Sequence, residues 1–347
     1  MWGWNRPACT GCRSTTCSRT ASSWWSATPP TSRTYRVDVK DAEWIADLVR
    51  HGLIRKSFVP PKWQRALRDL LRYRRKLVES ETAERNRLLR LLETCNIKLS
   101  PVASDVFGVS GRAMVRALIE GTATPEHMAK LARGSLRRKT DRLTLALRGQ
   151  LEEHHRFLLR LQLERVERIE ADIAVVMARI DQALAPYLEQ LERLTQIPGV
   201  DRIGAATIIA ELGIDMSVFP TARHAAAWAG VSPGNNQSAG KRAGNAKRRG
   251  NVHLMTALVQ AAFGASRKKG SYLKERFWRL KARRGDKRAA MAVAHSILVA
   301  AYEMLRRHAQ YRDLGAAYLD HIARAVTEKR LVRRLESMGY RVTLETA

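Results

Sequence analysis

The sequence predicts a mainly α-helical protein, and two long amphipathic stretches carry that prediction. Residues 62–94 place leucines at helical spacing among many arginines and glutamates, which is typical of a helix with one solvated face. Residues 151–194 contain a seam from Val166 to Ile180 whose apolar residues alternate three and four apart, as in a coiled coil. Pro186 should end or kink this second helix. Together the stretches predict an antiparallel helical arm. An ordinary helical bundle is the alternative, and the seam alone does not distinguish packing within one chain from packing between chains.

Shorter helices are predicted on both sides of the arm. Residues 38–52 read as a short helix with Asp38 as its N-cap. Ser110 is expected to cap the helix that follows it, and Thr124-Pro125 to begin another. The C-terminal half contains further helical patterns, at residues 221–229, 251–266, 288–307 and in the tail. These elements extend the helical prediction over most of the chain from residue 37 onward.

The charge of the chain is its most unusual property. Lys and Arg total 62 against 33 Asp and Glu, a formal net charge of +29 over 347 residues. Such an excess attracts polyanions, and nucleic acid is the commonest of them. A membrane surface is the competing partner, but the basic residues are spread along the chain, and the apolar run at 289–302 is too short to cross a bilayer. We therefore expect no membrane partner. The N-terminus lacks an apolar signal core, so we expect a cytoplasmic protein.

Residues 1–36 differ from the rest of the chain. They contain no Asp or Glu, are crowded with Ser, Thr, Trp, Cys and Arg, and follow neither a strand period nor a helix period. We expect this segment to be a poorly ordered arm or the translation of an out-of-frame stretch.

A basic loop at residues 232–250 is the first candidate for chemistry. It is rich in Gly and Asn and holds one central hydroxyl, that of Ser238. Its cations could grip a DNA phosphodiester and stabilise developing negative charge while the hydroxyl attacks phosphorus; they are Lys241, Arg242, Lys247, Arg248 and Arg249. No base lies nearby in the sequence. The alternative is therefore an ordinary loop serine among cations that only bind nucleic-acid backbone.

Two carboxylates near the start of the helical region form the second candidate. Asp38 and Asp41 are three residues apart at a helix start, so both can face one side. Two such oxygens can take part in a Mg²⁺ site. The alternative is that both acids only stabilise the first turn of the helix.

Residues 196–213 resemble a helix-hairpin-helix, in which the turn and the next helix N-terminus meet a DNA phosphate. The position of the usual second turn glycine is occupied by Asp201. A carboxylate there would repel phosphate, so a purely structural hairpin is the alternative.

Several motifs occur together in the order found in one family. The N-terminal half contains Val-Asp38-Val-Lys-Asp41-Ala-Glu-Trp, Ser-Phe-Val-Pro60-Pro61, Gly108-Val-Ser-Gly-Arg112 and His154-His-Arg-Phe. The C-terminal half contains Ile197-Pro-Gly-Val, Ala-Glu211-Leu-Gly213, Gln237-Ser238-Ala-Gly-Lys241 and Lys247-Arg-Arg-Gly-Asn251. On these motifs the chain resembles the insertion-sequence-110 family of transposases, and within it the 1111-type subgroup.

The resemblance implies a fold and an activity. It divides the chain into a remnant of a RuvC-like, RNase H-like α/β domain at 37–61, a coiled-coil arm at 62–194, a C-terminal transposase domain at 195–315 and a helical tail. It makes Asp38 and Asp41 the last two of four Mg²⁺-binding acids and Ser238 the nucleophile that attacks DNA. It also implies DNA transposition and recombination guided by a bridge RNA, by a dimer or tetramer assembled through the arm.

One departure from the family pattern affects activity. The family's first aspartate and its glutamate precede the Asp38 pair, and residues 1–36 contain neither. We therefore expect an N-terminally truncated or frameshifted reading frame whose product is inactive as a transposase. The competing hypothesis is a non-catalytic protein that grips DNA or RNA backbone through the basic loop.

Overall fold

The computed structural model describes residues 38–53, 59–232, 237–238, 241–242 and 250–343. By its internal contacts the chain divides into two compact units, residues 1–60 and 61–347. The described part is helical apart from one two-stranded ladder, so the mainly α prediction is confirmed. The predicted RuvC-like remnant falls in the first unit, where the described secondary structure is a single helix. Residues 1–36, for which disorder was expected, lie outside the described part.

Helix α1 (Asp38–Arg50) is that single helix of the first unit. It begins at Asp38 and is followed by Gly52, whose φ of +68° lies in the left-handed region that glycine adopts freely. The amide of Gly52 donates to the carbonyl of Val49 (3.1 Å). This is the glycine stop that ends many helices.

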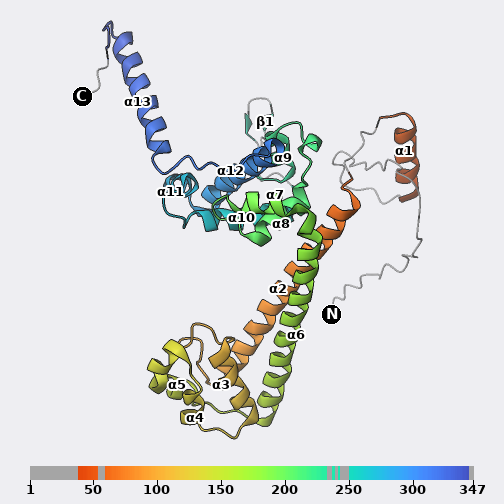
Figure 1. The fold of residues 1–347 in the computed structure, drawn as a ribbon, viewed down its shortest axis with the longest axis vertical. Helices are drawn as coiled ribbons and strands as arrows, with labels where there is room; N and C mark the ends of the chain where they lie inside the picture. Colours follow the sequence, from red (N-terminus) through yellow and green to blue (C-terminus); the bar gives the residue numbers. More distant parts are fainter. Residues whose placement is uncertain (1–37, 54–58, 233–236, 239–240, 243–249, 344–347) are drawn as a thin grey trace. The chain divides into compact units, whose positions relative to one another are not determined.

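The arm consists of α2 (Lys62–Thr94) and α6 (Glu153–Leu184), which lie side by side and antiparallel (Figure 1). Their contacts run in opposite directions along the chain: Arg85 pairs with Glu170 (2.7 Å), and Arg74 lies against Met177. The ends of the predicted seam, Val166 and Ile180, are completely buried. The seam therefore packs against α2 of the same chain, which answers a question that the sequence pattern left open.

A small helical cluster, here called the tip, lies at one end of the arm. It comprises α3 (Val109–Glu120), α4 (Pro125–Lys130), the 3₁₀ helix η1 (Gly134–Lys139) and α5 (Thr140–Ala146). Its apolar core includes Leu88 and Leu92 of α2 and Leu159 and Leu163 of α6. Because the tip and the arm share this apolar core, burial of its side chains fixes the tip to the arm.

The helix caps of the tip test two predictions. The Thr124 hydroxyl accepts from the amide of His127 (3.3 Å), so the predicted cap of α4 is confirmed. The prediction for Ser110 is wrong: the N-cap of α3 is Gly108, two residues earlier, and Ser110 lies inside the helix. The Ser110 hydroxyl instead accepts from the amide of Arg133 (2.9 Å), which ties α3 to the segment before η1.

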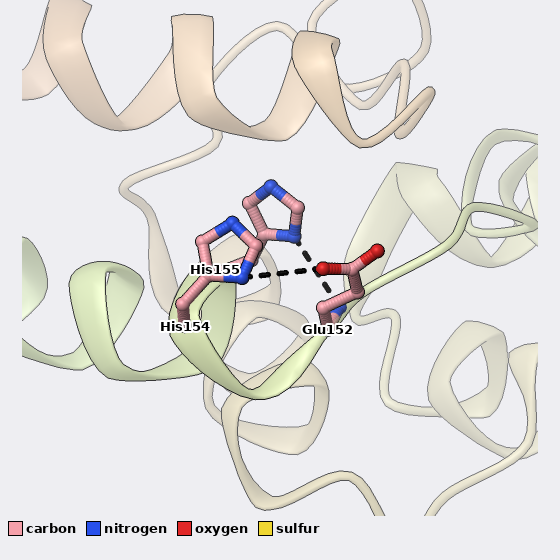
Figure 2. A group of neighbouring side chains, drawn as sticks. All are labelled: Glu152, His154 and His155. Carbon is pink, nitrogen blue, oxygen red and sulfur yellow. Dashed lines mark hydrogen bonds and ion pairs between the residues drawn. The ribbon is translucent and has the colours of Figure 1, made fainter.

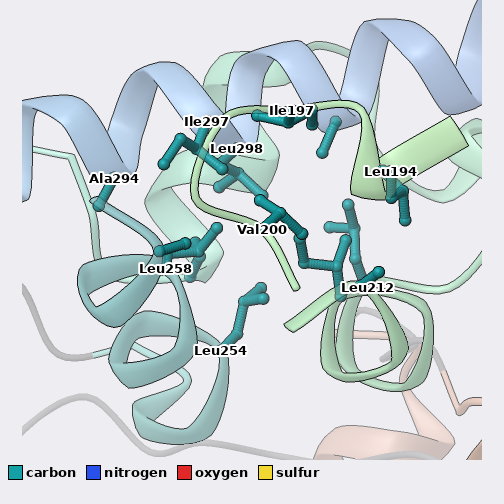
Figure 3. Packing of buried hydrophobic residues seen from close by; sticks show 14 of the residues in the cluster. Leu194, Ile197, Val200, Leu212, Leu254, Leu258, Ala294, Ile297 and Leu298 are labelled. Carbon is teal, nitrogen blue, oxygen red and sulfur yellow. The ribbon is translucent and has the colours of Figure 1, made fainter. Parts of the chain in front are cut away.

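A larger cluster, here called the base, lies at the other end of the arm. The break at Pro186 is confirmed, since α6 gives way to the 3₁₀ helix η2 (Ala185–Tyr187) and then α7 (Leu188–Thr195). The remaining elements are α8 (Arg202–Leu212), η3 (Met216–Val218), α9 (Ala222–Trp228), α10 (Val252–Ala265), α11 (Tyr272–Arg284) and α12 (Asp286–Arg307). Leu194, Ile197, Val200, Leu254, Leu258 and Ile297 interdigitate in their shared core (Figure 3).

Helix α12 is central to the base. By length and composition it is apolar enough to cross a membrane, and within the described residues it is the one helix that passes that test. Its apolar residues, however, form much of the core, with Val293, Ile297 and Leu298 completely buried. After α12, the predicted helical tail is confirmed as α13 (Tyr318–Ser337), which contacts α11 through an ion pair between Arg279 and Asp320.

Candidate nucleic-acid interface

Ser238, the predicted nucleophile, lies in the two-stranded ladder between α9 and α10. Strand β1 (Gln237–Ser238) pairs antiparallel with β2 (Lys241–Arg242), and Ser238 lies directly opposite Lys241. The backbone thus brings two of the predicted phosphate-binding cations into the same ladder as the predicted nucleophile. The other three predicted cations, Lys247, Arg248 and Arg249, lie outside the residues that the structure describes.

The basic loop joins the base through a narrow neck, formed by Trp228, Gly230, Gly250 and Asn251. The amide of Asn251 donates to the carbonyl of Trp228 (3.1 Å). A Cβ atom on Gly250 would come within 2.3 Å of the nitrogen of Gly230, so only glycine allows this approach. The two ends of the loop are therefore held together where they meet the helical core.

Behind the neck, Glu211 forms a buried polar network. Its side chain is only 2% exposed. Arg72 donates to both carboxylate oxygens (2.8 and 2.9 Å), and the Asn251 side-chain amide donates to one of them (2.7 Å). Arg68 Nε lies 3.4 Å from the Glu211 carboxylate, and the Arg68 guanidinium also donates to the backbone carbonyl of Glu211. The network joins α2 of the arm, α8 of the base and the start of α10 at one point.

Asn251 connects this network to the loop. Its side-chain oxygen accepts from the amides of His253 and Leu254 (3.0 and 3.1 Å), so it caps α10. Its side-chain nitrogen is the donor to Glu211. One residue therefore closes the neck, starts α10 and contacts the buried carboxylate.

The electrostatics of the network favour an ionised Glu211. Burial by itself would raise the pKa of this carboxyl. The hydrogen bonds from Arg72 and Asn251 and the charges of Arg72 and Arg68 outweigh burial, so the pKa lies below its usual value. Burial also lowers the pKa of Arg68. A buried carboxylate with bidentate and charge-assisted donors is strongly localised, which holds the three helices in one arrangement.

Glu211 and Asn251 belong to the sequence motifs, but no role was predicted for either residue. A signal was present: Glu211 is the one charged residue in the otherwise apolar stretch 203–213. A charge at such a position is rarely buried unless it is paired. Its partners could not be read from the pattern, because Arg72 lies 139 positions away along the chain.

The hairpin between α7 and α8 favours the structural alternative over phosphate contact. The carboxylate of Asp201 accepts from the amide of Gly204 (2.7 Å) and caps α8, so it occupies the place that a phosphate would take. Gly199, with a φ of +85°, packs against α10, and a Cβ there would lie 2.1 Å from the carbonyl oxygen of Ala261. Both features fit a turn that is built into the core.

A cleft of about 460 Å³ opens beside the Glu211 network, between α2, the α7–α8 turn and α10. Arg72, Arg74, Glu211 and His253 contribute to its walls. Burial, together with the charge of Arg72, lowers the pKa of His253, so its imidazole is neutral at pH 7. The cleft therefore places a neutral imidazole and arginines next to the neck of the loop.

The predicted Mg²⁺ ligands lie in the first compact unit. Asp38 and Asp41 are one helical turn apart at the start of α1, and Asp41 is exposed. Carboxylate oxygens are the donors that Mg²⁺ prefers, so the donor set fits part of such a site. Ser238 belongs to the second unit.

A different group of metal-ligand side chains occurs at the start of α6. In Glu152, His154 and His155 the nearest ligand atoms lie within 4.8 Å of one another. His154 Nδ1 is 3.3 Å from the Glu152 carboxylate, and His155 Nδ1 accepts from the Glu152 amide (Figure 2). The Glu152 side chain also accepts from the backbone amide of His155, so Glu152 and His155 form a capping box that satisfies the helix start. Two imidazoles and one carboxylate do not match the hard oxygen set of Mg²⁺, so this group is not the predicted site.

Comparison with known proteins identifies the chain. Residues 191–277 match the family model described as "Transposase IS116/IS110/IS902 family", and residues 29–97 match the IS110 DEDD transposase model. The chain is 28% identical over 226 residues to a "Probable family 20 transposase" of Pseudomonas aeruginosa, covering 65% of this chain and 58% of the relative. It is 31% identical over 164 residues to the transposase for insertion sequence element IS1111A of Coxiella burnetii, covering 43% and 44%. The chain belongs to the IS110 family of transposases.

The two matched stretches contain different sets of the residues described above. The DEDD match contains Asp38, Asp41 and the arginines of α2, whereas the second match contains Glu211, Ser238 and Asn251. The Glu211 network therefore links the two matched stretches by direct hydrogen bonds. The chain spans about half the length of these relatives, 58% and 44%. Most of the tip, including α3, α4 and α5, lies between the matched stretches.

Proposed function

We propose that this chain cuts and joins DNA with Ser238 as its nucleophile. The Ser238 oxygen attacks the phosphorus of a DNA phosphodiester and forms an oxygen–phosphorus bond. The bond from phosphorus to one DNA oxygen breaks, and that oxygen leaves as a hydroxyl end that takes up a proton. The energy of the original bond is kept in a serine–DNA phosphodiester. A DNA hydroxyl can then attack this linkage and release the serine.

The ladder opposite Lys241 is the observation that supports this proposal most directly. It places a lysine beside the proposed nucleophile in the backbone pairing, on a loop whose ends are fixed by the neck. A cation at that position suits the negative charge that develops as the serine oxygen attacks phosphorus. Membership of the IS110 family supports DNA as the substrate.

The remaining parts of the proposal rest on the family resemblance. Asp38 and Asp41 would hold Mg²⁺, which supplies a Lewis acid to polarise the phosphodiester. A bridge RNA would select the DNA, and two or four copies would assemble through the arm. The expectation of an inactive product, drawn from the missing acids, is the opposing hypothesis, and an adduct that depends on Ser238 would contradict it.

The decisive experiment looks for a covalent protein–DNA adduct. The full chain is incubated with Mg²⁺, an end-labelled DNA duplex spanning an element end and its target, and RNA transcribed from the element's own non-coding end. Adducts are separated on a denaturing gel. Ser238→Ala should abolish the adduct while DNA binding, measured by anisotropy, is retained. Ser232→Ala, at a serine on the near side of the same loop, is the matched control and should keep the adduct.

The outcomes separate the hypotheses. An adduct that survives Ser238→Ala contradicts the assignment of the nucleophile. Loss of the adduct in Asp41→Asn or in chelator, with binding unchanged, supports the carboxylate–Mg²⁺ part. If the unmodified chain binds DNA and forms no adduct under any of these conditions, the non-catalytic nucleic-acid-binding hypothesis replaces the proposal.

A further inference from the structure

The tip has a dense cationic surface far along the sequence from the basic loop. Between residues 130 and 142 the sequence holds six cations and one acid, Asp141. The six cations come from the end of α4, the segment after it, η1 and the first turn of α5. All six are exposed, and they are Lys130, Arg133, Arg137, Arg138, Lys139 and Arg142. We call these six residues the tip cations.

The tip cations differ from the cations where the tip joins the arm. At that junction Arg85 and Arg112 share Glu170, and Arg116 pairs with Glu167. Within the described part of the chain, none of the tip cations has a carboxylate within 4.0 Å. The chain therefore neutralises its arginines at the junction and leaves a block of positive charge open at the tip.

The backbone around the tip cations holds some of them in place. Lys139 Nζ donates to the carbonyl of Val102 (3.0 Å), and Arg137 Nε lies 3.4 Å from the carbonyl of Ala132. Arg138 and Arg142 are one turn apart in the continuous helical run from η1 into α5, so their side chains emerge as neighbours. Such a surface can meet several phosphates without first ordering a flexible tail.

The composition of the tip indicates which form of nucleic acid it suits. Proteins that bind single strands combine cations with exposed aromatic side chains on which bases stack. Residues 98–152, which include all six tip cations, contain one Phe and no Tyr or Trp, and that residue, Phe107, is buried in the tip core. The nearest exposed Phe, Tyr or Trp along the chain is Phe157 on α6, fifteen positions after Arg142. Cations without stacking partners suit the phosphates of a duplex, whose bases are already stacked.

We propose that the tip cations bind the backbone of duplex DNA, as a second contact surface besides the basic loop. The proposal rests on the proposed function for DNA as the partner and extends it by a separate binding surface. A duplex held at both places would be contacted by the base and by the tip through phosphates alone, without sequence readout at the tip.

The test measures how DNA affinity depends on salt. Anisotropy of a labelled duplex of arbitrary sequence is recorded for the full chain and for the triple variant Lys130→Gln, Arg138→Gln, Arg142→Gln between 50 and 300 mM salt, on the order of the range where counterion release is resolved. The slope of log Kd against log salt should fall by about 0.9 for each phosphate that the variant no longer neutralises. The loss of affinity should be the same for unrelated sequences.

A matched variant removes the same charge elsewhere. Helix α6 carries five arginines and six acids, so acidic residues on the same helix offset the charge of its exposed arginines. Arg160→Gln, Arg168→Gln, Arg179→Gln should leave the slope unchanged. Circular dichroism and the midpoint of thermal unfolding check that the tip variant is folded.

Each result decides the proposal. An unchanged slope in the tip variant, or an equal drop in the α6 variant, contradicts a specific tip contact. A drop with single-stranded or duplex RNA but not with duplex DNA assigns the surface to RNA and overturns the proposal. If the slope falls as expected and no Ser238 adduct forms, the proposed chemistry fails while the tip surface stands. If a Ser238-dependent adduct forms but the slope is unchanged, the proposed chemistry stands and the tip proposal fails.

Discussion

The base and the tip are both packed helical clusters on the same arm, yet they treat charge in opposite ways. The base buries an ionised carboxylate, Glu211, among two arginines and an asparagine. The buried polar group of the tip is a neutral hydroxyl, Ser110, among the residues that the structure describes, and its cations stay at the surface. Polar pairing of this kind accepts few alternative arrangements, whereas apolar packing tolerates several.

The difference follows from what each cluster has to join. The helices of the tip are consecutive in the sequence, between the end of α2 and the start of α6, so short connections already limit their arrangement. The base must fix segments that are distant in the sequence, with Arg72 and Glu211 139 positions apart. We infer that the Glu211 network sets the register of α2 against α8 and α10, and with it the position of the loop neck.

The largest expected effect comes from breaking that network. Glu211→Ala leaves Arg68 and Arg72 without their carboxylate in a buried site, which should lower the free energy of unfolding by about 3–5 kcal/mol. Glu170→Ala, at the more exposed junction of arm and tip, should cost only about 1 kcal/mol. Urea denaturation of both variants measures the difference. Equal losses would contradict the contrast between the two regions.

A smaller effect is expected at the turn between α7 and α8. Gly199→Ala would place a methyl group 2.1 Å from the Ala261 carbonyl oxygen at a φ of +85°, which should cost about 2–4 kcal/mol. Gly270 has a similar φ of +76° but open space around its Cβ position, so Gly270→Ala should cost only about 1 kcal/mol. Thermal unfolding of the pair isolates the packing contribution. A similar shift in Tm for both variants would mean that the turn does not pack tightly on α10.

The smallest effect is a pH dependence. The pKa of Glu211 is lowered in the folded state, so its contribution to stability is complete above the usual glutamate pKa of about 4.3 and is lost as the pH falls below it. The stability difference between the unmodified chain and Glu211→Gln should be constant from about pH 8 to 5 and then narrow. The difference in the free energy of unfolding should narrow by about 1.4 kcal/mol for each unit by which folding lowers the pKa of Glu211. Unfolding curves across this pH series measure it, and a difference independent of pH would show that folding does not lower the pKa of Glu211.

Much of the fold followed from local patterns in the sequence. The bounds of α2 matched the predicted 62–94, because Pro61 immediately precedes the helix and leucines at helical spacing occupy both of its ends. The break at Pro186 was confirmed for an equally local reason, since proline removes a helical hydrogen bond. Ser110 was misassigned because a serine before an apolar run resembles a cap, and only the tertiary contact with Arg133 shows its actual role.

The candidate site was harder to predict than the fold. Ser238 and its cations stood out by charge and by family resemblance, and the ladder now pairs Ser238 with Lys241. Of the supports beneath them, Glu211 pairs with Arg72, 139 positions earlier, and Asn251 donates to Glu211. No periodicity encodes such a pairing, so the sequence could mark the charged residue without naming its partners.

The neck has a consequence for how such proteins can diversify. The chain leaves the helical core after the buried Val231 and returns at Gly250, and a backbone hydrogen bond from Asn251 to Trp228 joins the two sides. Insertions or exchanges between the two sides of the neck need only preserve the contact of Gly230 with Gly250. The neck is thus a position at which the segment between its two sides could be exchanged while the helical scaffold is kept.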